Sequence, residues 1–265
     1  MKMNKLILKT NILFLFLSLY ITGCSSPVKP AGQQANSVGT SEIYFKTLLV
    51  IGDDRSGSTS DIRKLTSDDY RTLIESVGTK GGGSVAVCLI GNPKPQSREP
   101  YFLPLGTLEK ITPYDVKSND LTLTQRGQLK IANDKIIARN QEIIRGQAKN
   151  ITDYLNSKIN QNIIAYTSPP GRDQTDINDA VGRINTLVHE PQYDGYDKII
   201  VVLLSDGKNE PIGNKVITIS NKIKHPLVEF YLVGWETAIT CFEGRKVNMM
   251  SSKDGFIEII KNLKK

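Results

Sequence analysis

Short runs of almost unbroken apolar residues constrain the fold of this chain more than any other feature. They occur at 45–51 (FKTLLVI), 84–90 (SVAVCLI) and 198–204 (KIIVVLL). A central strand of a parallel sheet is covered on both faces, so it lacks the apolar-polar alternation of a half-exposed strand. Runs of this length fit buried strands better than helices. We therefore expect them to form the centre of a mostly parallel sheet.

Helical patterns alternate with these strands along the chain. Strands that alternate with helices form a doubly wound sheet, and right-handed crossovers place every loop that follows a parallel strand at one edge of it. The expected fold class is α/β, a Rossmann-like three-layer sandwich. Beyond the three runs we predict a strand at 227–233 and helices at 67–77, 176–188, 213–223 and 253–263, the first with Ser67 as its N-cap.

A short strand and a long helical segment elaborate this pattern. Residues 101–105 lie between Pro100 and Gly106, which predicts a short antiparallel edge strand. From about 124 to 159, apolar residues recur at three- and four-residue steps, which predicts one apolar stripe and an opposite solvated basic face. Gly127 and Gly146 allow a kink or a break into two helices. The stripe contains Leu129, Ala132, Ile136, Ile143, Ile144, Ala148, Ile151 and Leu155, and the basic face Lys130, Lys135, Arg139, Arg145 and Lys149.

The first residues have the composition of a secretory signal. Three lysines precede an apolar run at 12–21, which is shorter than the roughly 20 residues of a membrane-spanning helix. The run ends at Ile21-Thr22-Gly23-Cys24, which resembles the lipobox of bacterial lipoproteins. The resemblance implies cleavage before Cys24 and lipidation of its sulfur. We expect a protein of the cell envelope, anchored by lipid to a bacterial membrane, with the outer membrane or cell surface as the favoured place.

The predicted organisation of the 265 residues is a signal peptide at 1–23, a polar tether at 24–42, and one domain at 43–265 with the helical insertion at about 106–165. Removal of the signal leaves 31 basic and 27 acidic residues, a formal net charge of +4. The basic residues are scattered among acids, so we expect no nucleic-acid partner. Cys88 and Cys241 have no zinc or disulfide spacing, and Cys88 is expected to be a buried free thiol.

Three polar segments are candidates for a binding site. Asp54-x-Ser56-x-Ser58 follows the first strand, Thr175-Asp176 precedes a helix, and Ser205-Asp206-Gly207 follows the strand at 198–204. Ligands of open α/β sheets bind outside the carboxyl ends of the strands. If the two strands are neighbours, their loops converge and bring together hydroxyl and carboxylate oxygens. Such a donor set suits Mg²⁺ or Mn²⁺ and disfavours zinc.

The order of these segments resembles the metal-ion-dependent adhesion site of von Willebrand factor A and integrin inserted domains. The resemblance covers about residues 43–263 in strand order, but its specific motifs occupy only some ten positions. It implies that Ser56 and Ser58 bind the metal directly, that Thr175 binds it directly or through water, and that Asp54 and Asp206 hold water in the metal's shell. Neutral ligands leave much of the metal charge uncompensated. The implied function is metal-dependent binding of a protein partner that presents an acidic residue, in adhesion or scaffolding.

The chain also departs from that pattern. Asp173-Gln174 replaces the glycines that commonly precede the threonine, and the insertion is longer than the usual connection. Asp53, Asp173 and Asp176 are expected to add carboxylates near the site. We expect no enzyme, but a metal-dependent hydrolase and a solute-binding lipoprotein stay open as alternatives. His189 and His225 are interpreted as structural.

Overall fold

The computed structural model describes residues 45–56, 61–91, 99–112, 121–167, 174–211, 215–243 and 246–263. The predicted signal peptide and tether lie outside these residues, and so do Cys24, Ser58 and Asp173.

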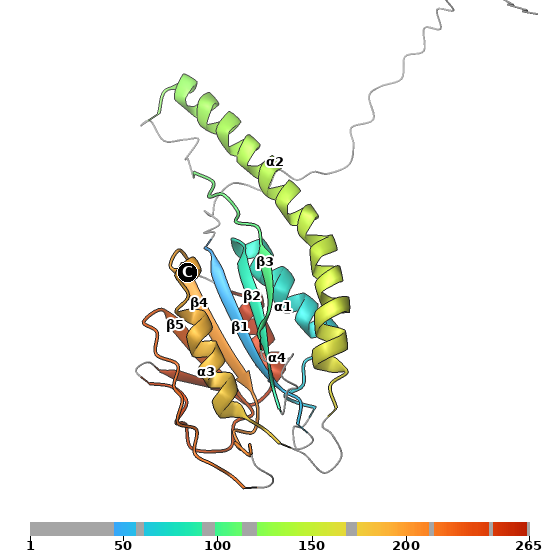
Figure 1. The fold of residues 1–265 in the computed structure, drawn as a ribbon. Helices are drawn as coiled ribbons and strands as arrows, with labels where there is room; N and C mark the ends of the chain where they lie inside the picture. Colours follow the sequence, from blue (N-terminus) through green and yellow to red (C-terminus); the bar gives the residue numbers. More distant parts are fainter. Residues whose placement is uncertain are drawn as a thin grey trace, which may run out of the picture. The chain divides into compact units, whose positions relative to one another are not determined.

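Six strands form one sheet in the order β3-β2-β1-β4-β5-β6. All neighbouring pairs are parallel except β2 and β3. The α/β class and the short antiparallel edge strand are therefore confirmed (Figure 1). The bounds are β1 Thr47–Asp54, β2 Gly83–Ile90, β3 Tyr101–Leu105, β4 Lys198–Leu204, β5 Val228–Val233 and β6 Val247–Met250.

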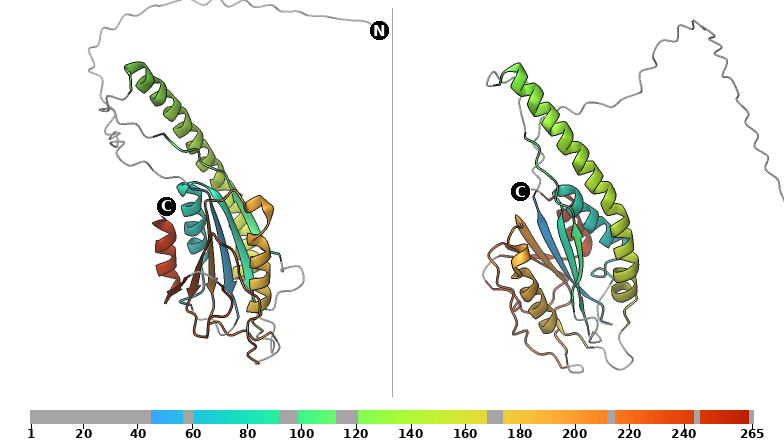
Figure 2. Two further views of the ribbon diagram at one scale, coloured as in Figure 1. Left: turned by 90° about the vertical axis from the view of Figure 1, so that its left-hand side faces the viewer. Right: turned by 45° about the horizontal axis from the view of Figure 1, so that its top comes forward.

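Helices cover both faces of the sheet, as Figure 2 shows. One apolar cluster joins the odd-numbered residues of β1 to α1, α4 and η2, and a second joins the even-numbered residues to α3. The strands at the centre are buried along their whole length because both faces are packed. The helices are α1 Ser67–Lys80, α2 Leu123–Tyr154, the π-helix η2 Leu155–Ile164, α3 Ile177–Val188, the 3₁₀-helix η3 Pro191–Tyr193 and α4 Lys253–Lys261.

The N-cap of helix α1 lies one residue earlier than the sequence predicts. Thr66, not Ser67, is the N-cap, and it exchanges hydrogen bonds with Asp69 in a capping box. Asp69 also accepts a bond from Lys253, which joins α1 to α4. The helix continues through Gly78 and ends at Lys80, so the predicted end at 77 is too early. The capping box gives a reason for the shift, because Thr66 and Asp69 have the spacing it needs and Ser67 lacks such a partner.

The predicted helix at 213–223 is wrong. Residues 215–223 contain no helix, and Ile223 instead forms a bridge with Phe242. The side chain of Asn178 accepts hydrogen bonds from the backbone amides of Ser220 and Asn221, which satisfies donors that a helix would otherwise satisfy. The segment is also rich in β-branched residues, which favour extended backbone. Strand β6 was not predicted, since its four residues are too few for a pattern.

Helix α2 is continuous through Gly127 and Gly146, and the change of geometry comes at Leu155, where the π-helix begins. The predicted apolar stripe is only partly buried. Ile151 and Leu155 enter the core, whereas Ala132 and Ala148 are exposed. The predicted basic face is exposed throughout, as expected.

The buried positions of the outer part of α2 are polar and spaced by seven residues: Asn133, Asn140 and Gln147. Asn140 donates to the carbonyl of Glu109 and accepts from its amide, at 2.9 Å each. Asn133 makes the same pair of bonds with Thr112. The extended segment 106–112 is thus fastened along α2 by side-chain amides, which is why hydrophobic periodicity did not identify the contact.

Candidate functional site

The site is built where two parallel strands end side by side. β1 lies between β2 and β4. The chain continues from β1 to β2 on one side and from β4 to β5 on the other, so the strand order reverses between β1 and β4. Loops after β1 and β4 leave a crevice there in open α/β sheets. The condition for convergence of the two loops, that β1 and β4 are neighbours, is therefore met.

Asp54 is the last residue of β1 and its carboxylate joins the two loops. One oxygen accepts a hydrogen bond from the Ser56 amide at 2.9 Å, and the other accepts from the Ser205 hydroxyl at 2.7 Å. Asp54 is fully buried. Burial raises its pKa, the bonds from Ser205 and Ser56 oppose that rise, and the charge of Asp206 adds to it. The negative charge of Asp206 therefore disfavours ionisation of Asp54.

The turn after β4 fixes Asp206. Its carbonyl accepts from the Glu236 amide at 2.9 Å, and one carboxylate oxygen accepts from the Lys208 amide at 2.9 Å. The other oxygen lies 3.5 Å from the Lys208 ammonium. Gly207 has a φ of 81°, and a Cβ there would lie 2.5 Å from the Trp235 ring, so the turn requires glycine at this position.

Thr175 reaches the same edge through backbone bonds. It pairs with Glu210, which follows the Asp206 turn, in both directions at 3.2 and 2.8 Å. The next amide, of Asp176, donates to Gly91 at the end of β2. Asp176 itself caps α3 by accepting from the Asp179 amide at 2.9 Å. Thr175 is therefore buried between the ends of β2 and β4.

The structure thus brings Asp54, Ser56, Thr175 and Asp206 to one edge of the sheet, from three separate segments. All four are at most 2% exposed. Ser58, the fifth predicted ligand, lies outside the described residues. Ser205 belongs to the cluster but was not among the predicted ligands, although its place directly after a strand was a usable signal.

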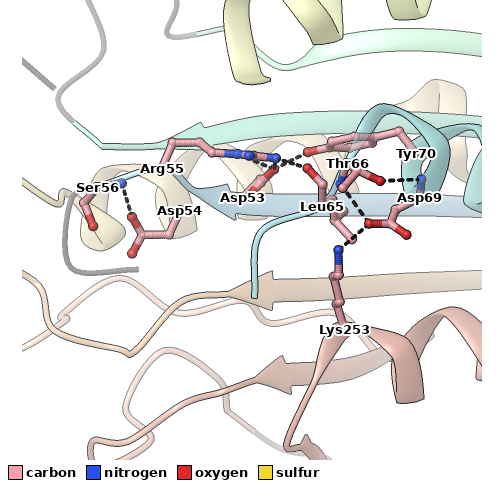
Figure 3. Close-up of polar contacts among 9 residues, drawn as sticks. All are labelled: Asp53, Asp54, Arg55, Ser56, Leu65, Thr66, Asp69, Tyr70 and Lys253. Atoms are coloured by element: carbon pink, nitrogen blue, oxygen red, sulfur yellow. Dashed lines mark hydrogen bonds and ion pairs between the residues drawn. The ribbon is translucent and has the colours of Figure 1, made fainter. Parts of the chain in front are cut away.

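Asp53 does not add its carboxylate to this edge, contrary to our expectation. Successive side chains of a strand point to opposite faces, and Asp53 turns toward α1, where it accepts from Arg55 and Tyr70 (Figure 3). Asp176 uses one carboxylate oxygen to cap α3, and its place near the site stays a prediction. Arg55 and Tyr70 were not recognised from the sequence, since an arginine inside a polar loop and a helical tyrosine carry no distinctive pattern.

The donor set fits a hard divalent cation. It offers hydroxyls from Ser56 and Thr175 and two carboxylates, and the described residues contain no cluster of three or more His, Cys, Asp or Glu side chains. The described donors of the site include no imidazole or thiol, the ligands that zinc favours. Two buried carboxylates that repel each other are an arrangement that a cation stabilises.

The other reactive side chains lie elsewhere. His189 and His225 contact each other edge to face, and their ring centroids are 5.2 Å apart. Cys88 and Cys241 are free and buried, as predicted for Cys88, and burial raises the pKa of each thiol to about 12. Cavities of about 640 and 400 Å³ are present among the described residues, and Asp54, Ser56, Thr175 and Asp206 line neither of them.

Comparison with protein-family models and with curated proteins finds no match to this chain. Among the described residues, no helix has the length and apolar character needed to cross a membrane.

Proposed function

We propose that this domain is a metal-dependent protein-binding domain of the von Willebrand factor A-like kind, which acts in adhesion or scaffolding. We further propose that a lipidated Cys24 tethers it to a bacterial membrane. The observation that carries the first proposal is the convergence of Asp54, Ser56, Thr175 and Asp206 at the carboxyl ends of β1 and β4. The strand order, with its antiparallel β3, supports it.

Some residues of the site would bind the metal ion, and others would orient those that bind it. Ser56 and Thr175, with Ser58, would present neutral hydroxyls to Mg²⁺ or Mn²⁺. Asp54 would hold Ser56 and Ser205 in place, as its two hydrogen bonds already do. A bound divalent cation would supply uncompensated positive charge at the protein surface, where the carboxylate of a partner gains a charge-assisted contact.

The surroundings favour recognition of a macromolecule over chemistry on a small substrate. Neither described cavity is lined by the site residues. A hydrolase would need a group that accepts a proton. The two histidines contact each other at the end of α3 and in the loop before β5, away from the strand ends that carry the site, so only the Asp54 or Asp206 carboxylate could take that role among the named site residues.

Metal uptake by the purified mature protein tests the proposal directly. Calorimetric titration with Mg²⁺ and Mn²⁺ should show one site in the wild type and none in Ser56→Ala or Asp206→Asn. Ser84→Ala is the matched control, because its hydroxyl is also buried but bonds Tyr196 at the opposite edge of the sheet. Absence of uptake by the wild type would refute the metal site.

A partner should be captured from whole cells by the wild type with Mg²⁺, and lost with chelator or in Asp206→Asn. Capture that is unaffected by chelator would point to the helical insertion instead. For the anchor, Cys24→Ser should release the protein from the membrane fraction. If the variant stays with the membrane, the anchor lies elsewhere.

A further inference from the structure

Arg55 occupies the position between two proposed site residues, Asp54 and Ser56, yet its side chain leaves the site. It turns to the opposite face of the sheet, where only 7% of it is exposed. There its guanidinium donates two hydrogen bonds to one oxygen of Asp53, at 2.9 and 2.6 Å. A buried arginine of this kind is uncommon unless it is paired.

The same guanidinium also contacts the chain beyond the proposed metal loop. It donates to the carbonyl of Leu65, and Tyr70 of α1 donates its hydroxyl to the Asp53 oxygen that Arg55 contacts. Figure 3 shows these side chains between the end of β1 and the start of α1. The polar network therefore joins Asp53 and Arg55, which precede Ser58, to Leu65 and Tyr70, which follow it.

Arg55 is held by its backbone as well as by its side chain. The Arg55 amide donates to the carbonyl of Ile90 at the end of β2, so backbone and side chain of this residue are both held. The Ser56 amide, one residue on, is held by Asp54. A backbone that is already fixed at Arg55 and Ser56 loses less conformational entropy when the Ser56 hydroxyl takes up a ligand.

We propose that Arg55 is a positioning residue for the metal site, held by Asp53, Tyr70 and the Leu65 carbonyl so that the adjoining backbone presents Ser56 in a binding geometry. This inference rests on the proposed function. It assigns to the buried network on the α1 face a role in ligand binding on the α3 face, across the sheet, in addition to its role in the fold.

The test separates positioning from stability. Tyr70→Phe removes one hydroxyl of the network, and the double variant Asp53→Leu/Arg55→Met replaces the buried pair by apolar side chains, a change that proteins often tolerate without loss of stability. Both should weaken Mn²⁺ binding about tenfold, as expected for residues that support ligands without touching the metal. Binding is measured by calorimetry, and circular dichroism at the same temperature establishes that each variant is folded.

Tyr154→Phe is the matched control. Tyr154 is also buried on the α1 face, and its hydroxyl donates to the Tyr101 carbonyl at 2.7 Å, away from the network. Its Mn²⁺ affinity should equal that of the wild type. If the wild type binds Mn²⁺ and the folded network variants bind equally well, the positioning role is overturned while the proposed function stands. If the wild type binds no Mn²⁺, both are overturned.

Discussion

Asp53 and Asp54 are adjacent, and both are completely buried, but they lie in opposite environments. On the α1 face, Asp53 has a guanidinium and a phenol as partners. On the α3 face, Asp54 has hydroxyl and amide donors, a second carboxylate nearby and no cation among its hydrogen-bond partners. The first carboxylate is neutralised within the protein, and the second is suited to an external cation. One strand end thus supplies both a structural ion pair and a ligand site.

The largest expected effect comes from breaking the pair on the α1 face. Arg55→Ala leaves the Asp53 carboxylate buried without a cation, and we expect a loss of about 3–5 kcal/mol in the free energy of unfolding. Urea denaturation measures it. Lys149→Ala, which removes an exposed pair with Asp153, is the control and should change stability by at most about 0.5 kcal/mol. Equal effects would remove the distinction between a buried and a surface pair.

Asp54→Asn, unlike Arg55→Ala, should abolish metal uptake without lowering the stability of the metal-free protein. Because burial raises the pKa of Asp54, its ionised form is less favourable in the folded than in the unfolded protein. The folded state then binds more protons, so stability rises as pH falls through the raised pKa toward the ordinary value. In chelator, the variant should be more stable than the wild type at neutral pH, and the difference should shrink with acidification. Melting temperatures across pH would show it, and a constant difference would contradict it.

Lys208→Gln tests how much the charge of a neighbouring lysine reduces metal binding at the Asp54 side of the sheet. The ammonium lies 3.5 Å from Asp206 and is about half exposed, so it offsets part of the negative charge that a metal would use. We expect Mg²⁺ affinity to rise two- to threefold, about 0.5 kcal/mol, as for a screened surface pair. Lys222→Gln, which removes a similarly exposed partner of Glu243, is the matched control and should leave the affinity unchanged.

The smallest expected effect is the absence of labelling at Cys88, on the α3 face. A thiol reagent at pH 8 should not modify it in the folded protein, because the side chain is buried and burial raises its pKa to about 12. Complete labelling should follow unfolding in urea. Rapid labelling of the native protein would mean that the α3 face opens readily, and that the site it supports is less fixed than the hydrogen bonds indicate.

The sequence was sufficient to predict the central strands and the edge strand, because apolar runs and prolines report burial and edge position directly. It also indicated that the loops carrying Asp54 and Asp206 would meet if their strands were neighbours, and the structure shows that β1 and β4 are neighbours. It failed where a side chain replaces a backbone partner. The Asn178 side chain accepts hydrogen bonds from the amides of Ser220 and Asn221. Ser220 is 42 residues away in the sequence, so no local sequence pattern predicts such a bond.

The direction of Asp53 was a different kind of error. Strand β1 continues to Asp54, so the alternation of side chains applies to both aspartates. Treating 52–58 as a loop removed that constraint and placed both carboxylates at one site. The metal itself, the partner and the anchor stay predictions, since they depend on Ser58, on Cys24 and on molecules other than this chain.

The side-chain amide bonds between α2 and the segment 106–112 limit how these two paired segments, called the arm here, can change in length. Asn140 and Asn133 are seven residues apart, roughly 10.5 Å of helix at 1.5 Å per residue. Their partners Glu109 and Thr112 are three residues apart, about 10 Å of extended chain. Two helical turns therefore match three extended residues. If seven residues of α2 and three residues of the facing segment are removed or added together, each side-chain amide still faces its backbone partner. A single-residue insertion in either segment would shift all the amides beyond it out of alignment with their partners.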